Sequence, residues 1–169
     1  MTLAIALLAF ITLQRLGELV LAERNTRRLK AKGAYEVGRE HYPLIVVLHA
    51  SWLAGLWLLG WNRPVNLWFL GAFVAVEVLR VWTLVSLGER WTTRIIVLPG
   101  APLVRRGPYR LMPHPNYVVT IVETLLLPLA FGAPALAAIF TVMWGSVLQY
   151  KIRLEDRALA SRRAITVEP

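Results

Sequence analysis

Five long apolar segments dominate this chain of 169 residues. They contain 20, 18, 21, 15 and 17 residues, more than half of the sequence. As helices, the first three would be about 27–32 Å long, enough to cross the hydrocarbon core of a bilayer, whereas the last two would reach only about 22–26 Å. The sequence therefore predicts an all-α integral membrane protein, a single domain over residues 1–169 with five transmembrane helices. The predicted helices are Leu3–Ala22, Leu44–Trp61, Leu67–Leu87, Tyr117–Phe131 and Pro134–Tyr150.

The last two predicted helices form a short hairpin around the sequence Phe131-Gly132-Ala133-Pro134. Glycine permits a tight bend there, and proline suits the first position of the helix that follows. The first segment lacks the features of a cleaved signal peptide, because no basic region precedes it and no small-residue cleavage site follows. We expect it to remain as a membrane anchor.

The formal net charge of +9 indicates how the helices are oriented. Of the 19 basic residues, 16 lie in residues 23–43, residues 88–116 and the tail 151–169, whereas the connections on the opposite side contain one, Arg63. The positive-inside rule then predicts an inner-membrane protein with its N-terminus outside and both long loops and the tail in the cytoplasm. Orientation and attraction to anionic lipid explain the charge, so membrane lipid rather than nucleic acid is the expected partner.

Two helices contain ionisable residues at helical spacing, and such residues are costly inside a membrane. Arg15 and Glu18 lie three residues apart in the first helix and are expected to pair. Glu77 and Arg80 have the same spacing in the third helix. They either neutralise each other or one of them reaches the head group of a substrate.

Glu123 in the fourth helix has no basic residue three or four positions away. It must be partnered from another helix, be protonated or face a polar cavity. His49 stands alone in the second helix, a pattern more typical of hydrogen bonding between helices than of ligand binding.

The sequence argues against metal and soluble nucleotide sites. It contains no cysteine, and its three histidines, His41, His49 and His114, do not recur at the spacing of helical metal ligands. A glycine-rich dinucleotide fingerprint and a P-loop are also absent from the sequence.

The loop of residues 88–116 contains apolar residues and turn-forming prolines, which predict an ordered cytoplasmic cap rather than a flexible connection. An antiparallel hairpin would bring its end, around His114, beside the start of the tail. A pocket formed by this loop and the tail would suit a zwitterionic ligand that carries a diol, although Glu155 and Asp156 could equally be solvated charges. The residues expected to gather there are Arg110, His114, Asn116, Tyr117, Arg153, Glu155 and Asp156, with Glu123 below.

The sequences Gly107-Pro108-Tyr109-Arg110 and His114-Pro115-Asn116-Tyr117, together with the acidic pair after the last helix, resemble the isoprenylcysteine carboxyl methyltransferase family. The members are integral membrane enzymes that transfer a methyl group from S-adenosylmethionine (SAM) to a lipid-borne acceptor and release S-adenosylhomocysteine, without a metal. The resemblance implies SAM-dependent O-methyl transfer to a lipophilic small molecule. It places the cofactor at His114, Pro115, Tyr117, Glu155 and Asp156, with Gly107, Tyr109, Arg110 and Arg153 close by.

Nearly the whole chain resembles one bacterial branch of the family, the methyltransferases that accompany type III polyketide synthases. The resemblance rests on Gln14–Leu19, Arg90–Ile96 and the HPNY sequence that leads to Glu123. It implies a long-chain alkylpyrone or alkylresorcinol as acceptor, with an isoprenylcysteine carboxylate as the alternative from the wider family. Pro113 and Val119 depart from the family pattern, which usually has arginine and glycine at these positions.

Methyl transfer to oxygen requires mainly that donor and acceptor are held in line and shielded from water. For a phenolic acceptor we expect Glu123 or His114 to act as the base and Arg80 or Arg110 to stabilise the anion, whereas an acidic pyrone enol needs no base. A small membrane transporter and a non-catalytic membrane subunit remain alternatives. The sequence leaves the oligomeric state open.

Overall fold

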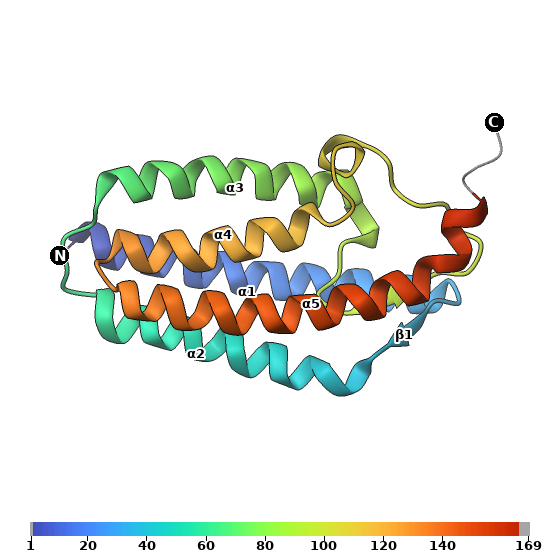
Figure 1. The fold of residues 1–169 in the computed structure, drawn as a ribbon, viewed down its shortest axis with the longest axis horizontal. Coiled ribbons are helices and arrows are strands. Elements are labelled where there is room, and N and C mark those ends of the chain that lie inside the picture. The colour runs from blue at the N-terminus through green and yellow to red at the C-terminus, as the bar shows by residue number, and fades with distance from the viewer. Residues whose placement is uncertain (1, 166–169) are drawn as a thin grey trace.

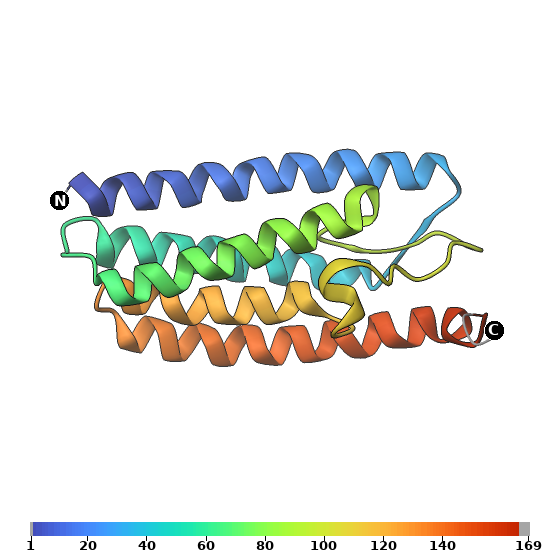
Figure 2. The same cartoon turned by 90° about the horizontal axis from the view of Figure 1, so that it is seen from above.

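The structure is a computed structural model that describes residues 2–165, with side chains for residues 3–160. Five helices run along the long axis of the molecule, and a two-stranded ribbon lies at one end (Figures 1 and 2). The elements in chain order are α1 (Thr2–Ala31), β1 (Tyr35–Val37), η1 (Arg39–His41), α2 (Tyr42–Gly60), α3 (Leu67–Leu87), η2 (Gly88–Arg90), β2 (Ile95–Val97), η3 (Gly107–Arg110), α4 (Pro115–Ala130) and α5 (Pro134–Ile165).

Two helices extend well beyond their apolar segments. α1 continues past Ala22 to Ala31, and α5 continues past Tyr150 to Ile165, so most of the predicted tail is helical. Both extensions contain strong helix formers without glycine or proline, and such residues sustain a helix after the apolar pattern ends. The rest of the predicted tail, residues 166–169, lies outside the described part of the chain.

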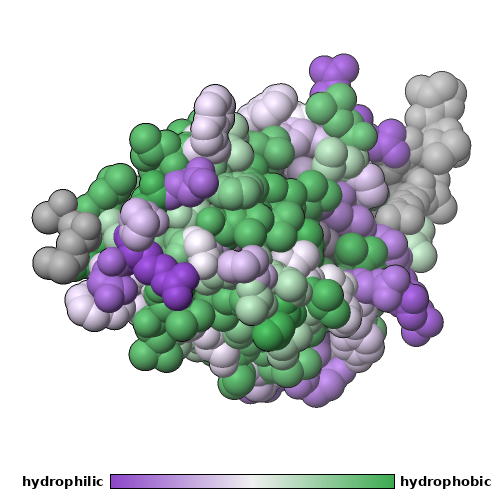
Figure 3. Space-filling view, turned by 60° about the vertical axis from the view of Figure 1, so that its left-hand side comes forward, coloured by the Kyte–Doolittle hydropathy of each residue, from purple (hydrophilic) through white to green (hydrophobic). Residues whose placement is uncertain are grey.

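Four of the helices are long and apolar enough to cross a membrane: α1, α2, α3 and α5. α4 is a shorter apolar helix of 16 residues. The expectation of two short final helices is therefore wrong for α5, which has 32 residues. Large apolar side chains point outward along the bundle, including Leu58, Trp68 and Val142, and hydrophobic residues cover much of the face in Figure 3. These features fit an integral membrane protein.

The short connections and the long loops lie at opposite ends of the bundle. The start of α1, the α2–α3 connection and the α4–α5 turn share one end, whereas the long loops and the C-terminal part of α5 share the other (Figure 1). Gly132 has a φ of 64° in the α4–α5 turn, and Arg63 donates a hydrogen bond to its carbonyl oxygen at 2.7 Å. α3 has its predicted limits because the Asn66 side chain caps its first turn.

The apolar core divides into two clusters. In the larger one, side chains from α1, α2, α3 and α4 meet around Trp52, Phe73 and Phe131, all of which are almost fully buried. In the smaller one, α2 packs on α5 through Ile45 and Trp144. His49 lies beside this second cluster, with its ring 5.7 Å from that of Trp144. Its Nε2 has no hydrogen-bond partner among the described residues, so contact between rings replaces the expected hydrogen bond.

A buried ionic network connects α1 to α3 and α4. Arg15 of α1 is 5% exposed and donates to Glu18 at 2.7 Å, which confirms the expected pair. It also reaches Glu77 of α3 at 3.3 Å and Glu123 of α4 at 3.0 Å. Gln14 adds a hydrogen bond to Glu77 at 2.5 Å. One arginine thus joins three helices.

Arg80 pairs with Glu123 rather than with its neighbour Glu77, so the predicted pair within α3 is wrong. Its Nε and Nη2 donate to the two carboxylate oxygens of Glu123, both at 2.6 Å, and Nη1 lies 3.4 Å from Glu18. A bidentate pair between helices satisfies both groups better than a pair along one helix, because the planar guanidinium matches the carboxylate. Glu123 therefore takes the first of its expected alternatives, a partner from another helix.

The two-stranded ribbon corrects the all-α prediction in one respect. β1 and β2 pair antiparallel, with Glu36 opposite Ile96, and so join the α1–α2 loop to the loop before α4. Glu36 accepts hydrogen bonds from Lys30 and Arg94, both at 2.7 Å. Burial opposes ionisation of Glu36, but these two hydrogen bonds outweigh burial and hold its pKa below the ordinary value. The strands were not predicted because each has only three residues.

We predict that Glu123→Gln lowers the free energy of unfolding by about 3–5 kcal/mol, because it leaves two buried arginines short of a counter-charge. Glu23→Gln is the control, since Glu23 forms an exposed pair with Arg27 and such pairs contribute about 0–1 kcal/mol. Thermal unfolding of both variants in the same detergent measures the difference. Equal stability of the two variants would refute a structural role for the network.

Candidate active site

A cavity of about 670 Å³ lies at the loop end of the bundle, a volume typical of small-molecule sites. Its walls come from the end of α3, the segment between α3 and α4, the start of α4 and the last turns of α5. The lining residues that bear on its chemistry are Arg90, Trp91, Arg94, Leu103, Arg105, Tyr109, Arg110, His114, Asn116, Tyr117, Glu155 and Leu159.

Four predicted site residues meet at one side of this cavity, and three of them, His114, Tyr117 and Glu155, line it. The Tyr117 hydroxyl donates a hydrogen bond to Glu155, and His114 Nε2 lies 3.1 Å from an oxygen of Asp156. His114 Nδ1 is 3.7 Å from Glu155, and the His114 ring stacks on Tyr117 with 5.3 Å between centroids. The α4 start and the α5 extension are thus joined by two acids, an imidazole and a phenol.

The prolines around His114 explain how it reaches this position. His114 is the residue before the first turn of α4, and Pro115 occupies the first helical position, where its missing N–H costs no hydrogen bond. Pro115 is buried and does not line the cavity. Its role is to fix where α4 begins, which places His114 and Tyr117 on the same side of the helix start.

On α5, helical spacing separates the cavity residues from their neighbours. Lys151, Glu155 and Leu159 are four residues apart and share one face. Arg153 is exposed and does not line the cavity, because two residues along a helix turn a side chain to the opposite side. Asp156 contacts His114 from beside the cavity rather than from its wall.

Lys151 lies next to the site residue Tyr117 without lining the cavity, and the sequence did not single it out. It is buried, donates to the carbonyl oxygen of Thr93 at 2.8 Å and lies 5.3 Å from the centre of the Tyr117 ring. In the sequence, Lys151 could not be distinguished from the other basic residues that follow the apolar segments. Its spacing of four from Glu155 is the signal that could have revealed it, once α5 is known to continue past Tyr150.

Tyr109 and Gly107 belong to η3, directly before the cavity. Tyr109 lines the cavity, and burial together with the nearby Glu155 carboxylate raises the pKa of its hydroxyl well above the ordinary value. Gly107 does not line it. It has a φ of 56°, and a side chain there would overlap the Ser86 hydroxyl of α3, so its role is the close approach of η3 to α3.

Arginines make most of the cavity wall positive. Arg90, Arg94, Arg105 and Arg110 all line it, whereas Glu155 is the one acidic residue among the described lining residues. Arg94 is neutralised by Glu36, and its guanidinium lies 3.8 Å from the centre of the Tyr42 ring. The Asn116 side chain accepts a hydrogen bond from the Trp91 indole at 3.3 Å.

The other predicted site residues lie elsewhere. Glu123 and Arg80 belong to the buried network and do not line the cavity. Pro113 lines it, whereas Val119 is packed in the interior at 1% exposure. Within the described part of the chain, no group of three or more histidine, aspartate or glutamate side chains is arranged to hold a metal ion.

Comparison with known proteins identifies the family of this chain. The sequence model of the isoprenylcysteine carboxyl methyltransferase family matches residues 69–161, a span that contains η3, all of α4 and the cavity wall on α5. The chain belongs to this family. Membership indicates a membrane methyltransferase, and the enzymes of this family use SAM.

Two curated relatives extend the similarity over most of the chain, and both are uncharacterized proteins. The protein YpbQ of Bacillus subtilis is 39% identical over 158 residues, which cover 90% of this chain and 94% of the relative. A protein of Haemophilus influenzae is 25% identical over 153 residues, which cover 86% of this chain and 88% of the relative. No solved structure matches the chain.

We predict that Gly107→Ala lowers the free energy of unfolding by about 2–4 kcal/mol, because strain at positive φ adds to the overlap with Ser86. Gly100→Ala is the matched control. Gly100 also has a positive φ, 71°, but its missing side chain would meet no atom within 4 Å, so strain alone should cost about 1–2 kcal/mol. Chemical unfolding in detergent compares the two, and an equal loss would show that η3 can move away from α3.

Proposed function

We propose that the protein transfers a methyl group from SAM to an oxygen of a lipophilic acceptor at the cytoplasmic face of the membrane. The observation that carries the proposal is the cluster of His114, Tyr117 and Glu155 at the wall of the 670 Å³ cavity, with Asp156 against His114 from beside it. It joins the start of α4 to α5, 38 residues apart between Tyr117 and Glu155, and gathers two acids around one imidazole.

The cavity residues fit the chemistry of SAM, which has an ammonium, a carboxylate, a ribose diol and a sulfonium. One oxygen of Glu155 accepts the Tyr117 hydrogen bond, and the other has no hydrogen-bond donor among the described residues, which leaves it for a ribose hydroxyl or the ammonium. Arg110 is a cation for the carboxylate, and Tyr109 and Tyr117 offer rings to the sulfonium. When bound, SAM supplies an electrophilic methyl group.

The residues of the chain then have two tasks: they hold the cofactor in one orientation and keep water away. His114 positions both acids, since it contacts Asp156 at 3.1 Å and lies 3.7 Å from Glu155. Trp91 and Asn116, joined by a hydrogen bond, line the same cavity and reduce the room for water beside a bound cofactor. Orientation of this kind lowers the barrier of a two-reactant step by several kcal/mol.

For the acceptor we propose a long-chain alkylpyrone or alkylresorcinol. Its alkyl chain would remain in or near the bilayer, because the cavity lies at the end of the apolar helices. Of the sequence-predicted acceptor residues, His114 and Arg110 line the cavity. His114 is the proposed base for a phenolic acceptor, and Arg110 is kept for the carboxylate of SAM. Glu123 and Arg80 are assigned to holding the helices together.

Glu155→Gln tests the cofactor site. We expect the variant to lose at least about tenfold in SAM affinity, since a charged hydrogen bond contributes about 1.5–3 kcal/mol. Calorimetric titration of the detergent-purified protein with SAM measures it, and Glu40→Gln, an exposed acid away from the cavity, is the control. Unchanged affinity would remove Glu155 from the site, and absence of SAM binding to the wild type would favour a transporter or a non-catalytic subunit.

Extraction of lipid after incubation of membranes with methyl-labelled SAM identifies the acceptor. Labelled alkylpyrone or alkylresorcinol supports the proposal for the bacterial branch. Labelled isoprenylcysteine would instead assign the chain the acceptor of the wider family.

The orientation can be tested by cysteine labelling. Because the sequence contains no cysteine, an introduced cysteine is the single thiol that can react. We predict that Asn62→Cys in intact cells reacts with a membrane-impermeant maleimide, whereas Arg39→Cys reacts only after lysis. The positive-inside distribution of basic residues is the reason. The reverse pattern would place the cavity outside the cytoplasm.

A further inference from the structure

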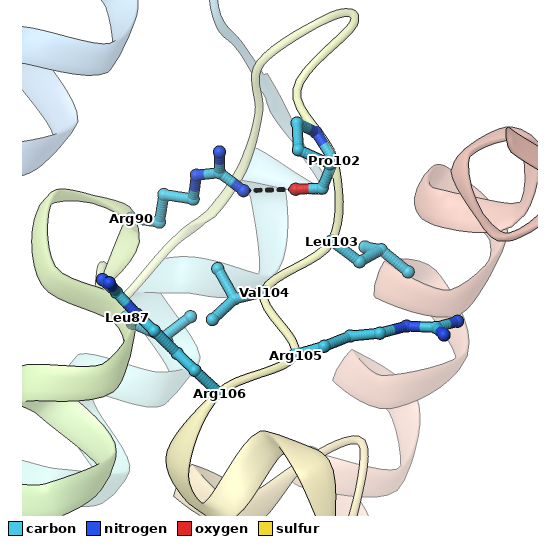
Figure 4. Close-up of a pocket in the computed structure, with 7 residues that line it drawn as sticks. All are labelled: Leu87, Arg90, Pro102, Leu103, Val104, Arg105 and Arg106. Atoms are coloured by element: carbon cyan, nitrogen blue, oxygen red, sulfur yellow. Dashed lines mark hydrogen bonds between the residues drawn. The ribbon is translucent and has the colours of Figure 1, made fainter. Parts of the chain in front are cut away.

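A second cavity of about 370 Å³ adjoins the first. Every residue that lines it, except Arg106, also lines the larger cavity, so the two form one continuous space with a side compartment. We call this compartment the arginine annex (Figure 4). Its lining residues are Leu87, Arg90, Pro102, Leu103, Val104, Arg105 and Arg106.

The annex combines apolar walls with one guanidinium, that of Arg105, that has no partner among the described residues. Arg90 donates to the Pro102 carbonyl, and Arg106 donates to the Ser86 carbonyl at 2.7 Å, so both bind the backbone. Arg105 has no hydrogen bond or ion pair within the described part of the chain. Its side chain points away from Arg106, toward the side on which α5 lies (Figure 4). An uncommitted cation beside leucine and valine side chains suits an amphiphile with an anionic head.

The same space is poor in groups that could take a proton. Among its described lining residues, the groups with the strongest capacity to accept a proton are His114 and Glu155. Neither of them lines the annex, whose ionisable lining residues are all arginines. An acceptor bound there has no adjacent base among these residues, so it is better served when it arrives ionised.

We infer that the arginine annex is the acceptor site and that it selects a lipophilic acceptor whose reacting oxygen is already an anion, an acidic enol or a carboxylate. Arg105 holds that anion, and Leu87, Leu103 and Val104 contact the first part of its apolar chain. This inference rests on the proposed function. In the transfer, the bond between sulfur and methyl breaks with its electron pair going to sulfur, and the anionic oxygen forms the new bond. The positive and negative charges cancel, and no proton is released.

Arg105→Met tests the inference, because it removes the charge and keeps an apolar stem. The acceptors are a hydroxypyrone with a long alkyl chain, whose enol is ionised at neutral pH, and a resorcinol with the same chain, whose phenol is not. We expect a loss of roughly 10- to 100-fold in kcat/KM on the pyrone, a clearly smaller loss on the resorcinol and unchanged SAM affinity. Arg105→Lys should recover part of the pyrone activity. Arg39→Met, an exposed arginine outside both cavities, is the control.

Three results would overturn the inference while the proposed function stands. They are equal losses on the two acceptors, a loss of SAM affinity in Arg105→Met, and a wild type that binds SAM but neither acceptor in calorimetric titration. Failure of the proposed function is a different result, namely a wild type that does not bind SAM. A folded Arg105→Met variant is recognised by a thermal unfolding midpoint equal to that of Arg39→Met.

Discussion

The ion pairs of Arg15 and Arg80 with Glu123 are the interaction on which the arrangement of α1, α3 and α4 depends. Lipid tails are as apolar as leucine, so apolar contact alone gives membrane helices little reason to choose one rotation over another. Charges buried between helices remove that freedom, because each guanidinium must face its carboxylates or remain unpaired at a cost of several kcal/mol. The network therefore fixes which faces of α1 and α3 point inward. It also explains why Glu123 is unsuited to chemistry, since both of its oxygens are already bound by guanidinium groups.

Helix number and the limits of α3 could be predicted from the sequence, because apolar length and a capping Asn66 are local signals. The partners inside the membrane could not. Arg80 and Glu77 had the spacing of a pair, but Glu123 lies 43 residues away in the sequence and offered a bidentate partner. Spacing along one helix shows which charged side chains are able to pair, but the packing of the helices determines which pairs form. The same limit concealed the ribbon, whose two three-residue strands are stable only because each has the other.

At the cavity, the resemblance to the family identified the residues that meet, His114, Tyr117, Glu155 and Asp156, and the structure explains how. α5 continues as a helix, so residues four apart share the cavity face and Arg153 turns away. Lys151 could be singled out only once α5 was known to continue past Tyr150. The guanidinium of Arg105, unpartnered among the described residues, could not be foreseen among so many arginines. Burial distinguishes the first, and the absence of a carbonyl or acidic partner among the described residues distinguishes the second.

The shortness of α4 would set the depth in the membrane of the proposed methyl transfer. Its 16 residues span about 24 Å, less than the roughly 30 Å of a hydrocarbon core, and the tight α4–α5 turn fixes its far end near the opposite surface. His114, at the near end of α4, then lies at or below the level of the lipid head groups, while the long α5 continues past it toward the water. A reactive oxygen at the end of an alkyl chain dissolved in the membrane would already lie at the depth of this cavity. The acceptor would therefore not have to leave the bilayer, whereas a water-soluble cofactor would enter the cavity from the aqueous side.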